Sequence, residues 1–461
     1  MTHVAEHTDL LVTFGGLRRS NSWVVSGRHN RHVGSGYARR AGATTRIVSL
    51  SAQRDDAFAD VGAEWISVMP GTDTAVMLSL IHVLITDGLA DQEFLARYTV
   101  GAGEVGDYVL GHADGIPKTP EWAEAISRVP ADRLRRLAHE MAAGRTLVNV
   151  VFALQRGEHG DQPVFAGLTL AAFLGQIGLP GGGYTHGFGS MGDFGMGFER
   201  VLAYWAGGNP FHHHQDLRRL TRALGRLDTF VVDEMHWTPT AKHADIVLPV
   251  ATTLERDDIA VGAGDARLRV SRRAVAPYAD AREEFAIFTE LARRLTADFD
   301  EGLSAADWLR KMYEDWRATD ASPPAPPFDE FWEAGGVPLP QRPYDDPVFS
   351  DFRADPDLHP LQTPSGRIEL YSATIASYGL RDVPGHAAWI EPTQWWRSSL
   401  AATYDLHLLC NQPSHRLHSQ QDMGAASRST KIAGREPIRL HPADAVARGL
   451  RDGDFARVRS A

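Results

Sequence analysis

Polar side chains gather in three loops of this chain, each directly after an apolar segment. The first loop runs from Gly15 and Gly16 to Asn21 and follows the apolar run at residues 9–14. Glycine lets a backbone approach a ligand closely, and an amide side chain can donate and accept hydrogen bonds. The spacing is not that of the Gly-x-Gly-x-x-Gly fingerprint, so by itself it is only a weak indication of phosphate binding, because turn glycines are common.

The second loop, residues 155–162, lies between an apolar strand-like run and an apolar helix-like run. It begins with Gln155 and Arg156 and reads Gln-Arg-Gly-Glu-His-Gly-Asp-Gln. Six polar side chains between two buried segments need either many hydrogen bonds or a ligand. The sequence therefore indicates a ligand-binding loop, with a solvated loop as the alternative.

The third loop follows the apolar run at residues 406–410 and carries amides, an arginine and histidines. Such side chains could hydrogen-bond a purine edge and pair with phosphate oxygens. An exposed polar turn is the alternative. The candidate binding residues of this loop are Asn411, Gln412, Arg416, His418, Ser419 and Gln420.

Other candidate sites are weaker. His212, His213 and His214 are adjacent, so their side chains point apart, and no acidic or cysteine partner has ligand spacing; we expect no zinc site there. Cys410 is the only cysteine, so no internal disulfide or iron–sulfur cluster is possible, and we expect it to be buried. A GxSxG elbow and a P-loop are both absent.

The composition of the chain argues against several classes of function. The chain has 461 residues, with 47 basic and 58 acidic residues and a net charge of -11, which argues against broad nucleic-acid binding. No stretch approaches the ~20 apolar residues that span a bilayer, so we expect no membrane span. The first residues lack the basic and apolar regions of a secretory signal.

The order of apolar runs predicts an α/β protein of several domains. Strands at 9–14, 46–50 and 146–153 alternate with helices, which indicates a parallel, Rossmann-like sheet. A second α/β segment has its clearest strands at 229–232 and 245–250. The last segment looks β-rich and barrel-like, with strands at 406–410, 438–440 and 455–458. We expect domains at 1–198, 199–385 and 386–461, the first two α/β and cofactor-binding, the third incomplete.

Both ends of the chain are unusual for complete domains. A buried-type strand begins nine residues from the start, and another ends three residues before the end. Core strands so close to both ends need partners. We therefore expect the chain to be a fragment of a longer protein.

A series of longer motifs adds a family resemblance. The chain resembles the molybdopterin guanine dinucleotide enzymes that reduce dimethyl sulfoxide, trimethylamine N-oxide and biotin sulfoxide, over nearly its whole length and in the family's order. The motifs are GLPGGGY from Gly178, NPFHHHQD from Asn209, HADIVLP from His243 with TTLERD from Thr252, TPSGRIE from Thr363, NQP from Asn411 with RLHSQ from Arg416, GREP from Gly434 and HPAD from His441.

The resemblance implies a cofactor and assigns residues to it. In this family an S-oxide or N-oxide gives up its oxygen atom at a molybdenum ion held by two molybdopterin guanine dinucleotides, and two electrons and two protons restore the metal. By resemblance Gly15, Gly16 and Asn21 would lie against one dinucleotide, and Asp73 would reach its guanine. The residues implied near the pterin or substrate are Gln155 and Arg156, and those contacting the cofactor from other domains are Asn209, Asn411, Gln412, Arg416, His418, Ser419 and Gln420.

The chain also departs from the family pattern. Ser51 and Ala52 stand where the family strand ends in Asp-Pro, so a hydroxyl replaces a carboxylate at that cofactor contact. Leu17 and Arg18 stand where the family usually has Asp-Pro. The region that ligates molybdenum in the family has no counterpart before Asp9, and the C-terminal barrel stops early.

Three functions remain open from the sequence. The first is a molybdenum S-oxide or N-oxide reductase with an incomplete chain, acting on a small-molecule oxide with an unidentified electron donor. The second is a dehydrogenase on the same scaffold, and the third is a non-catalytic remnant. Family members that reduce biotin sulfoxide are cytoplasmic, and those that reduce trimethylamine N-oxide are exported. We expect a cytoplasmic location, or a periplasmic one if the missing N-terminus carries an export signal.

Overall fold

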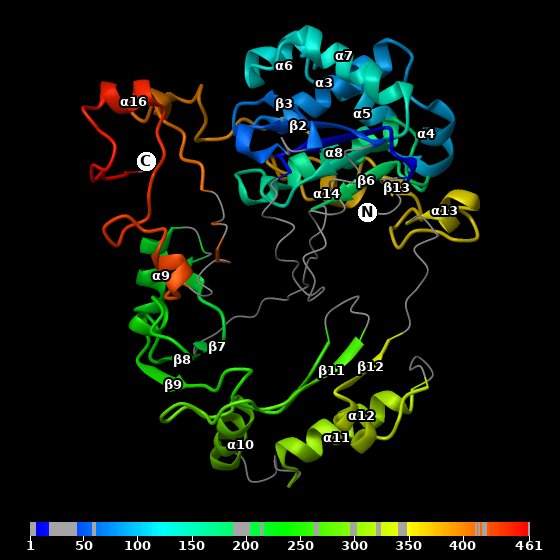
Figure 1. Cartoon of the computed structure of the whole chain (residues 1–461). Coiled ribbons are helices and arrows are strands. Elements are labelled where there is room, and N and C mark those ends of the chain that lie inside the picture. The colour runs from blue at the N-terminus through cyan, green and yellow to red at the C-terminus, as the bar shows by residue number, and fades with distance from the viewer. Residues whose placement is uncertain are drawn as a thin grey trace.

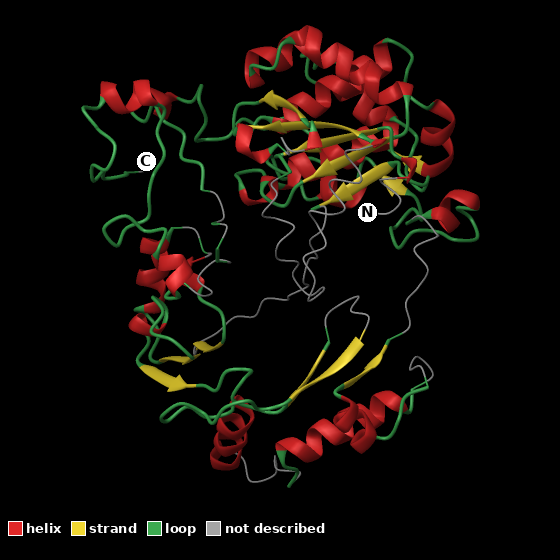
Figure 2. Ribbon diagram, in the orientation of Figure 1, coloured by secondary structure: helices red, strands yellow, loops and turns green. Residues whose placement is uncertain are grey.

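The chain is described by a computed structural model, shown in Figures 1 and 2. The described residues are 6–17, 44–57, 61–187, 203–212, 214, 216–261, 267–295, 302–319, 324–339, 348–410, 413, 415–416 and 422–459. Among them, no helix is both long and apolar enough to cross a bilayer.

The first unit is built on a five-stranded, all-parallel sheet with strand order β3-β2-β1-β5-β6. This confirms the α/β class and the parallel sheet predicted from the sequence. The three central strands of the sheet, β2, β1 and β5, consist mainly of buried residues, as is typical of a sheet covered on both faces. The strands are β1 (Leu10–Phe14), β2 (Arg46–Ser51), β3 (Glu64–Ser67), β5 (Thr146–Val150) and β6 (Gly183–His186).

Alternation along the strands divides the core between two faces of the sheet. Leu10 and Val12 of β1 belong to a large cluster formed with helices, whereas Leu11, which lies between them, packs with Ile47 and Leu147 in a smaller one. Helices α3 (Asp73–Thr86) and α8 (Asp161–Phe173) are apolar on most sides because they are buried in the larger cluster. The other helices of this unit are α4 (Gln92–Tyr98), α5 (Ala102–Val109), α6 (Pro120–Ser127) and α7 (Ala131–Ala143), of which α6 and α7 lie beside α3 above the sheet in Figure 1.

Residues 348–398 return to this first unit. The short strand β13 (Ile368–Glu369) pairs in parallel with β4 (Thr99–Val100). The Tyr98 hydroxyl donates to the Arg353 carbonyl at 2.7 Å, and the Trp389 amide donates to the Tyr108 hydroxyl at 3.0 Å. This return also contains α13 (Ser350–Ala354) and α14 (Ala373–Ser377). The predicted domain boundaries stay predictions.

The second α/β segment contains two small sheets. Strands β7 (Ala203–Ala206), β8 (Phe230–Glu234) and β9 (Ile246–Pro249) are parallel, and the latter two lie where the sequence predicted them. An antiparallel sheet covers a small aromatic core in which Tyr313 stacks on Phe331 at 4.2 Å between ring centroids. Its strands are β10 (Asp258–Ala260), β11 (Arg267–Ser271) and β12 (Gly336–Pro338), and the helices of the segment are α9 (Leu217–Leu224), α10 (Glu284–Leu295), α11 (Ala305–Arg317) and α12 (Phe328–Ala334).

The described residues after 398 contain helices but no strand. They form α15 (Ala425–Arg428) and α16 (Pro442–Ala447), coloured orange to red in Figure 1. The strands predicted at 406–410, 438–440 and 455–458 are therefore wrong in this structure. Leu408, Ile438 and Phe455 are 55%, 45% and 69% exposed, so no strand or core formed by the described residues covers these apolar runs. Cys410 is exposed, and the prediction that it is buried is also wrong.

Candidate cofactor-binding site

The candidate site begins where the strand order of the first sheet reverses. From β1 the chain proceeds outward to β2 and β3 on one side, and β5 and β6 follow on the other side. In parallel α/β sheets the loops at the carboxyl ends of the strands diverge at this point and leave a crevice for a ligand. Gly15 and Gly16 follow β1, and the 3-10 turn Leu154–Arg156 follows β5.

Gly15 and Gly16 are both required by the geometry of this crevice. Their φ angles are +82° and +91°, a region that side chains disfavour. A Cβ on Gly15 would lie 2.4 Å from Val151 Cγ2, and one on Gly16 would lie 2.7 Å from Asp56 Cβ. The loop after β1 is thus in contact with the loops after both of its neighbours, and only glycine fits at these two positions.

A buried pair of polar side chains holds the start of this loop. Asn149 Nδ2 donates to Thr13 Oγ1 at 2.8 Å, and the same hydroxyl donates to the Gly16 carbonyl at 2.7 Å. Thr13 and Asn149 face each other across β1 and β5, and neither is exposed. The hydroxyl therefore links the sheet interior to the glycine loop.

We expect Thr13→Val to destabilise the fold by about 1–3 kcal/mol, since valine keeps the shape but leaves two buried polar groups without this partner. Urea unfolding measures the change. Thr86→Val is the matched control, because the Thr86 hydroxyl bonds its own helix at an exposed position. Equal effects of the two substitutions would contradict a supporting role for Thr13.

Asp73 is the first residue of α3 and is 4% exposed. Burial raises the pKa of its carboxyl to about 7, and backbone hydrogen bonds from Asp73 itself and from Gly15 only partly oppose this. Its Oδ1 is buried and has no hydrogen-bond partner among the described residues. A buried acceptor without a donor, beside the glycine loop at a helix N-terminus, is suited to a ligand that brings its own N–H groups.

Ser51 ends β2 next to Gly16, but its hydroxyl serves local structure. It donates to the Gln53 carbonyl at 2.7 Å and lies 3.1 Å from Trp65 Nε1. Ser51 is 2% exposed. The structure thus places Ser51 at the predicted edge with its hydroxyl already bonded, and a cofactor contact by Ser51 stays a prediction.

Gln155 and Arg156 lie on the exposed loop after β5, as expected for a ligand-facing position. Gln155 Oε1 is 3.1 Å from His186 Nε2, and His186 Nδ1 is 2.9 Å from the Val150 carbonyl. The sequence did not single out His186. Its position at the last residue of β6, at the same sheet edge, is the signal that could have found it.

The same loop is tied to the returning segment by Glu158, which the sequence did not assign. Glu158 Oε2 accepts hydrogen bonds from the Thr393 amide at 2.8 Å and from the Thr393 hydroxyl at 2.9 Å. The loop after β5 is therefore continuous with β5 at one end and tied to the returning segment through Thr393.

The His186–Gln155 contact makes a testable prediction. Burial lowers the pKa of His186. A neutral ring that donates from Nδ1 to the Val150 carbonyl has a lone pair at Nε2, so the Gln155 amide makes a hydrogen bond there by turning its NH2 group toward Nε2. We expect Gln155→Glu to raise the pKa of His186 by roughly one unit, because a carboxylate favours the imidazolium. An NMR titration of the ring, assigned with His186→Gln, measures the shift. An unchanged titration would mean that the two side chains do not meet in solution.

Asn209 lies in the loop that follows β7, the first strand of the second parallel sheet, just as Gly15 follows β1 in the first sheet. It is 4% exposed, its Oδ1 accepts from the Thr240 hydroxyl, and its Nδ2 is buried without a partner among the described residues. It thus offers a donor at the carboxyl end of a parallel strand. No group of three or more His, Cys, Asp or Glu in the described part of the chain is placed to hold a metal ion.

The third predicted loop falls largely outside the described residues, as does Asn21. Asn411, Gln412, His418, Ser419 and Gln420 lie there, and their assignments stay predictions. Arg416 is described and pairs with Glu436 at 2.9 Å and with Asp422 at 3.1 Å. Its guanidinium is therefore engaged by carboxylates of the C-terminal segment, and the structure does not bring it to the glycine loop.

Comparison with known proteins identifies the family. Residues 4–294 match the molybdopterin oxidoreductase family, and residues 406–461 match the molybdopterin dinucleotide binding domain. This chain belongs to the molybdopterin oxidoreductase family. The predicted resemblance is confirmed, and the cofactor that these two matches indicate is molybdenum with bis(molybdopterin guanine dinucleotide).

Relatives of known activity cover almost the whole chain. It is 38% identical to a biotin sulfoxide reductase of Cereibacter sphaeroides, over 99% of this chain and 68% of the relative. It is 37% identical to a dimethyl sulfoxide/trimethylamine N-oxide reductase of the same organism, over 99% of this chain and 63% of that one. For a trimethylamine-N-oxide reductase of Haemophilus influenzae the values are 35%, 90% and 58%. The chain thus spans about six to seven tenths of the length of these relatives.

A solved structure supports the fold. Acetylene hydratase from Pelobacter acetylenicus superposes with a TM-score of 0.66 at 19% identity, over 97% of this chain and 66% of that one. At this identity the likeness concerns the fold of the molybdopterin enzymes.

The described residues fit the family's dinucleotide. A guanine presents N–H donors and a carbonyl acceptor on its edge. Asp73 Oδ1 is an acceptor without a partner and Asn209 Nδ2 is a donor without one, both buried and both at carboxyl ends of parallel strands. Gly15 and Gly16 hold the loop after β1 against Val151 and Asp56 of the neighbouring loops, and a phosphate contact by their backbone stays a prediction.

Proposed function

We propose that this chain is a large part of a molybdenum-dependent reductase that removes an oxygen atom from a small S-oxide or N-oxide. The observation that carries the proposal is the 38% identity with a biotin sulfoxide reductase across 99% of this chain. The other relatives named above, which act on dimethyl sulfoxide and trimethylamine N-oxide, support the same class of substrate.

In this proposal the chain's residues bind and orient. The backbone of Gly15 and Gly16 would contact the pyrophosphate, Asp73 would accept from one guanine, and Asn209 would donate to the other. Molybdenum held by the two pterins supplies the two-electron redox chemistry when bound. Gln155 and Arg156 would donate hydrogen bonds to the oxide oxygen, which carries partial negative charge, and so hold the substrate at the crevice.

The overall reaction is balanced by two electrons and two protons. The S–O or N–O bond breaks, the sulfide or amine leaves with its lone pair restored, and the oxygen is released as water. The electrons come from a donor of unspecified identity. A cytoplasmic location stays a prediction.

A reductase assay tests the proposal directly. Protein produced in molybdenum-replete cells is analysed for molybdenum and then supplied with reduced methyl viologen and either biotin sulfoxide, dimethyl sulfoxide or trimethylamine N-oxide. We expect oxide-dependent oxidation of the viologen with at least one of them. Molybdenum-loaded protein that reduces none of the three would contradict the proposed activity, whereas protein without molybdenum would contradict the cofactor assignment to this chain alone.

A further inference from the structure

A polar pocket lies at the edge of the first sheet where the strands begin, opposite the candidate cofactor site. Its volume is about 290 Å³, and its walls come from the turn before β5, the segment before β6, the N-cap of α4, and α13. All these strand-flanking segments lie at amino ends of strands. Across a five-residue strand, this edge is roughly 15 Å from the glycine loop. The pocket is therefore separate from the candidate cofactor site.

Arg145 is the feature of this pocket that lacks a structural explanation. Its backbone is well bonded, with the amide donating to Asp9 Oδ2 at 2.8 Å. Its guanidinium Nη1, however, is buried and has no hydrogen-bond partner among the described residues. A buried charged donor left without an acceptor is costly, and such groups in native proteins are usually satisfied by a ligand, an ion or water.

Arg353 brings a second guanidinium to the same pocket from a distant part of the sequence. Its Nη1 donates to the Gly175 carbonyl at 2.9 Å and to the Ile177 carbonyl at 2.7 Å, which fixes the side chain at the pocket wall. Burial lowers the pKa of Arg353; Tyr98 and Asp91 partly oppose this shift, and the charge of Arg145 acts in the same direction as burial. The positively charged guanidinium groups of Arg145 and Arg353 therefore line the same pocket.

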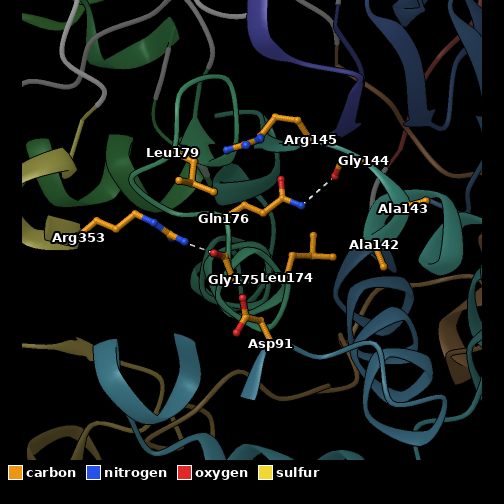
Figure 3. A pocket seen from close by; sticks show the side chains of 10 residues that line it. All are labelled: Asp91, Ala142, Ala143, Gly144, Arg145, Leu174, Gly175, Gln176, Leu179 and Arg353. Atoms are coloured by element: carbon orange, nitrogen blue, oxygen red, sulfur yellow. Dashed lines mark hydrogen bonds between the residues drawn. The ribbon is translucent and has the colours of Figure 1, made fainter. Parts of the chain in front are cut away.

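The remaining polar wall is already satisfied. Gln176 Nε2 donates to the Gly144 carbonyl at 2.8 Å, and its Oε1 accepts from the Thr146 amide at 2.7 Å. Figure 3 shows Gln176 with both arginines reaching the pocket around it. The donors left for a ligand are thus guanidinium N–H groups, which match a pair of oxygens on one anion.

We propose that this pocket binds an oxoanion, the phosphate or carboxylate group of a small ligand, with Arg145 as the principal donor. Asp91 is the acidic residue of the pocket wall. Its Oδ1 is used by the Phe94 amide at 2.8 Å as the N-cap of α4, so the carboxylate is fixed in place and opposes a bound anion.

Calorimetry tests the proposal. The full chain is titrated with inorganic phosphate and, separately, with acetate at constant ionic strength. We expect saturable binding that Arg145→Gln weakens by about tenfold or more, because a charge-assisted donor is lost. Arg136→Gln, at an exposed position on α7, is the matched control and should leave the affinity unchanged. The two anions distinguish the source, since tighter binding of one identifies the group that the pocket prefers.

Asp91→Asn gives an independent check. Asparagine also caps a helix, so α4 is retained while the negative charge is removed. The affinity for the anion should rise several-fold, by the Coulomb energy of one removed like charge. Absence of saturable binding, or equal affinities of Arg145→Gln and the unchanged chain, would overturn the proposal. If Arg145→Gln does not fold, an unchanged affinity in Asp91→Asn would overturn it.

Discussion

Replacing Asp73 by asparagine should make the cofactor-free chain more stable and at the same time weaken its binding of guanine nucleotide. Burial raises the pKa of this carboxyl from 3.8 to about 7. The folded chain therefore holds the proton more tightly than the unfolded chain. Ionising Asp73 therefore destabilises the folded chain. This destabilisation is absent below pH 4, grows as pH rises, and is complete above pH 7, where asparagine should add up to about 4 kcal/mol of stability.

Guanine binding should change in the opposite direction. An ionised Asp73 can accept hydrogen bonds from guanine N–H groups, and loss of such a charged bond weakens binding by about 10- to 100-fold. Affinity for guanosine monophosphate in the unchanged chain should also fall as pH drops below about 7, because protonation removes the charge of Asp73 and turns one of its two acceptor oxygens into a donor. In Asp73→Asn this pH dependence should disappear.

Urea unfolding at pH 8 and pH 5.5, with calorimetry of guanosine monophosphate binding at both, measures these effects. A variant that is simply misfolded would lose stability as well as binding, so higher stability with weaker binding is specific to a ligand-binding carboxylate. Unchanged nucleotide affinity would remove Asp73 from the site.

Gly15→Ala should be strongly destabilising and should abolish nucleotide binding. Its φ of +82° costs an alanine roughly 1–2 kcal/mol. The new methyl would also overlap Val151 Cγ2 at 2.4 Å and Leu154 Cγ at 2.8 Å, which typically adds about 1–3 kcal/mol. Relief of this overlap would push the loops after β1 and β5 apart at the crevice.

Gly88→Ala separates the two effects. Gly88 has a φ of +69°, and a Cβ there would meet nothing within 4 Å. We therefore expect only the conformational cost of roughly 1–2 kcal/mol and unchanged nucleotide binding. Urea unfolding of both variants gives the difference. Equal destabilisation would show that the loops after β1 and β5 are not in close contact.

The sequence predicted the parts of the fold in which local pattern and tertiary packing agree. The apolar runs at 9–14, 46–50 and 146–153 became β1, β2 and β5, because strands buried on both faces are marked by continuous apolar residues. Their order, with β1 in the centre, is not encoded in any single run. The apolar runs at 406–410, 438–440 and 455–458 have the same local pattern, but a strand also needs a neighbour to bond, and the structure provides none among the described residues.

The sequence predicted residues of the candidate cofactor site only where it also predicted the end of the strand that precedes them. Gly15, Gly16 and Gln155 follow predicted strands, and the structure brings them to one edge. Asp73 was assigned through family resemblance, and only the packing of α3 shows that its Oδ1 is buried without a partner. Arg145 and Arg353 are 208 positions apart, so the pocket that they share depends on the return of residues 348–398, which no local pattern predicts.

We propose that the carboxyl edge of the first sheet, with Gly15 and Asp73, binds a molybdopterin guanine dinucleotide. The most direct measurement is the amount of guanine nucleotide released by acid from purified, folded chain produced in molybdenum-replete cells, with molybdenum determined in the same sample. We predict guanine nucleotide and molybdenum from the unchanged chain, and a large loss of both from Asp73→Asn. Folded chain that carries neither, or Asp73→Asn that carries as much as the unchanged chain, would contradict the claim.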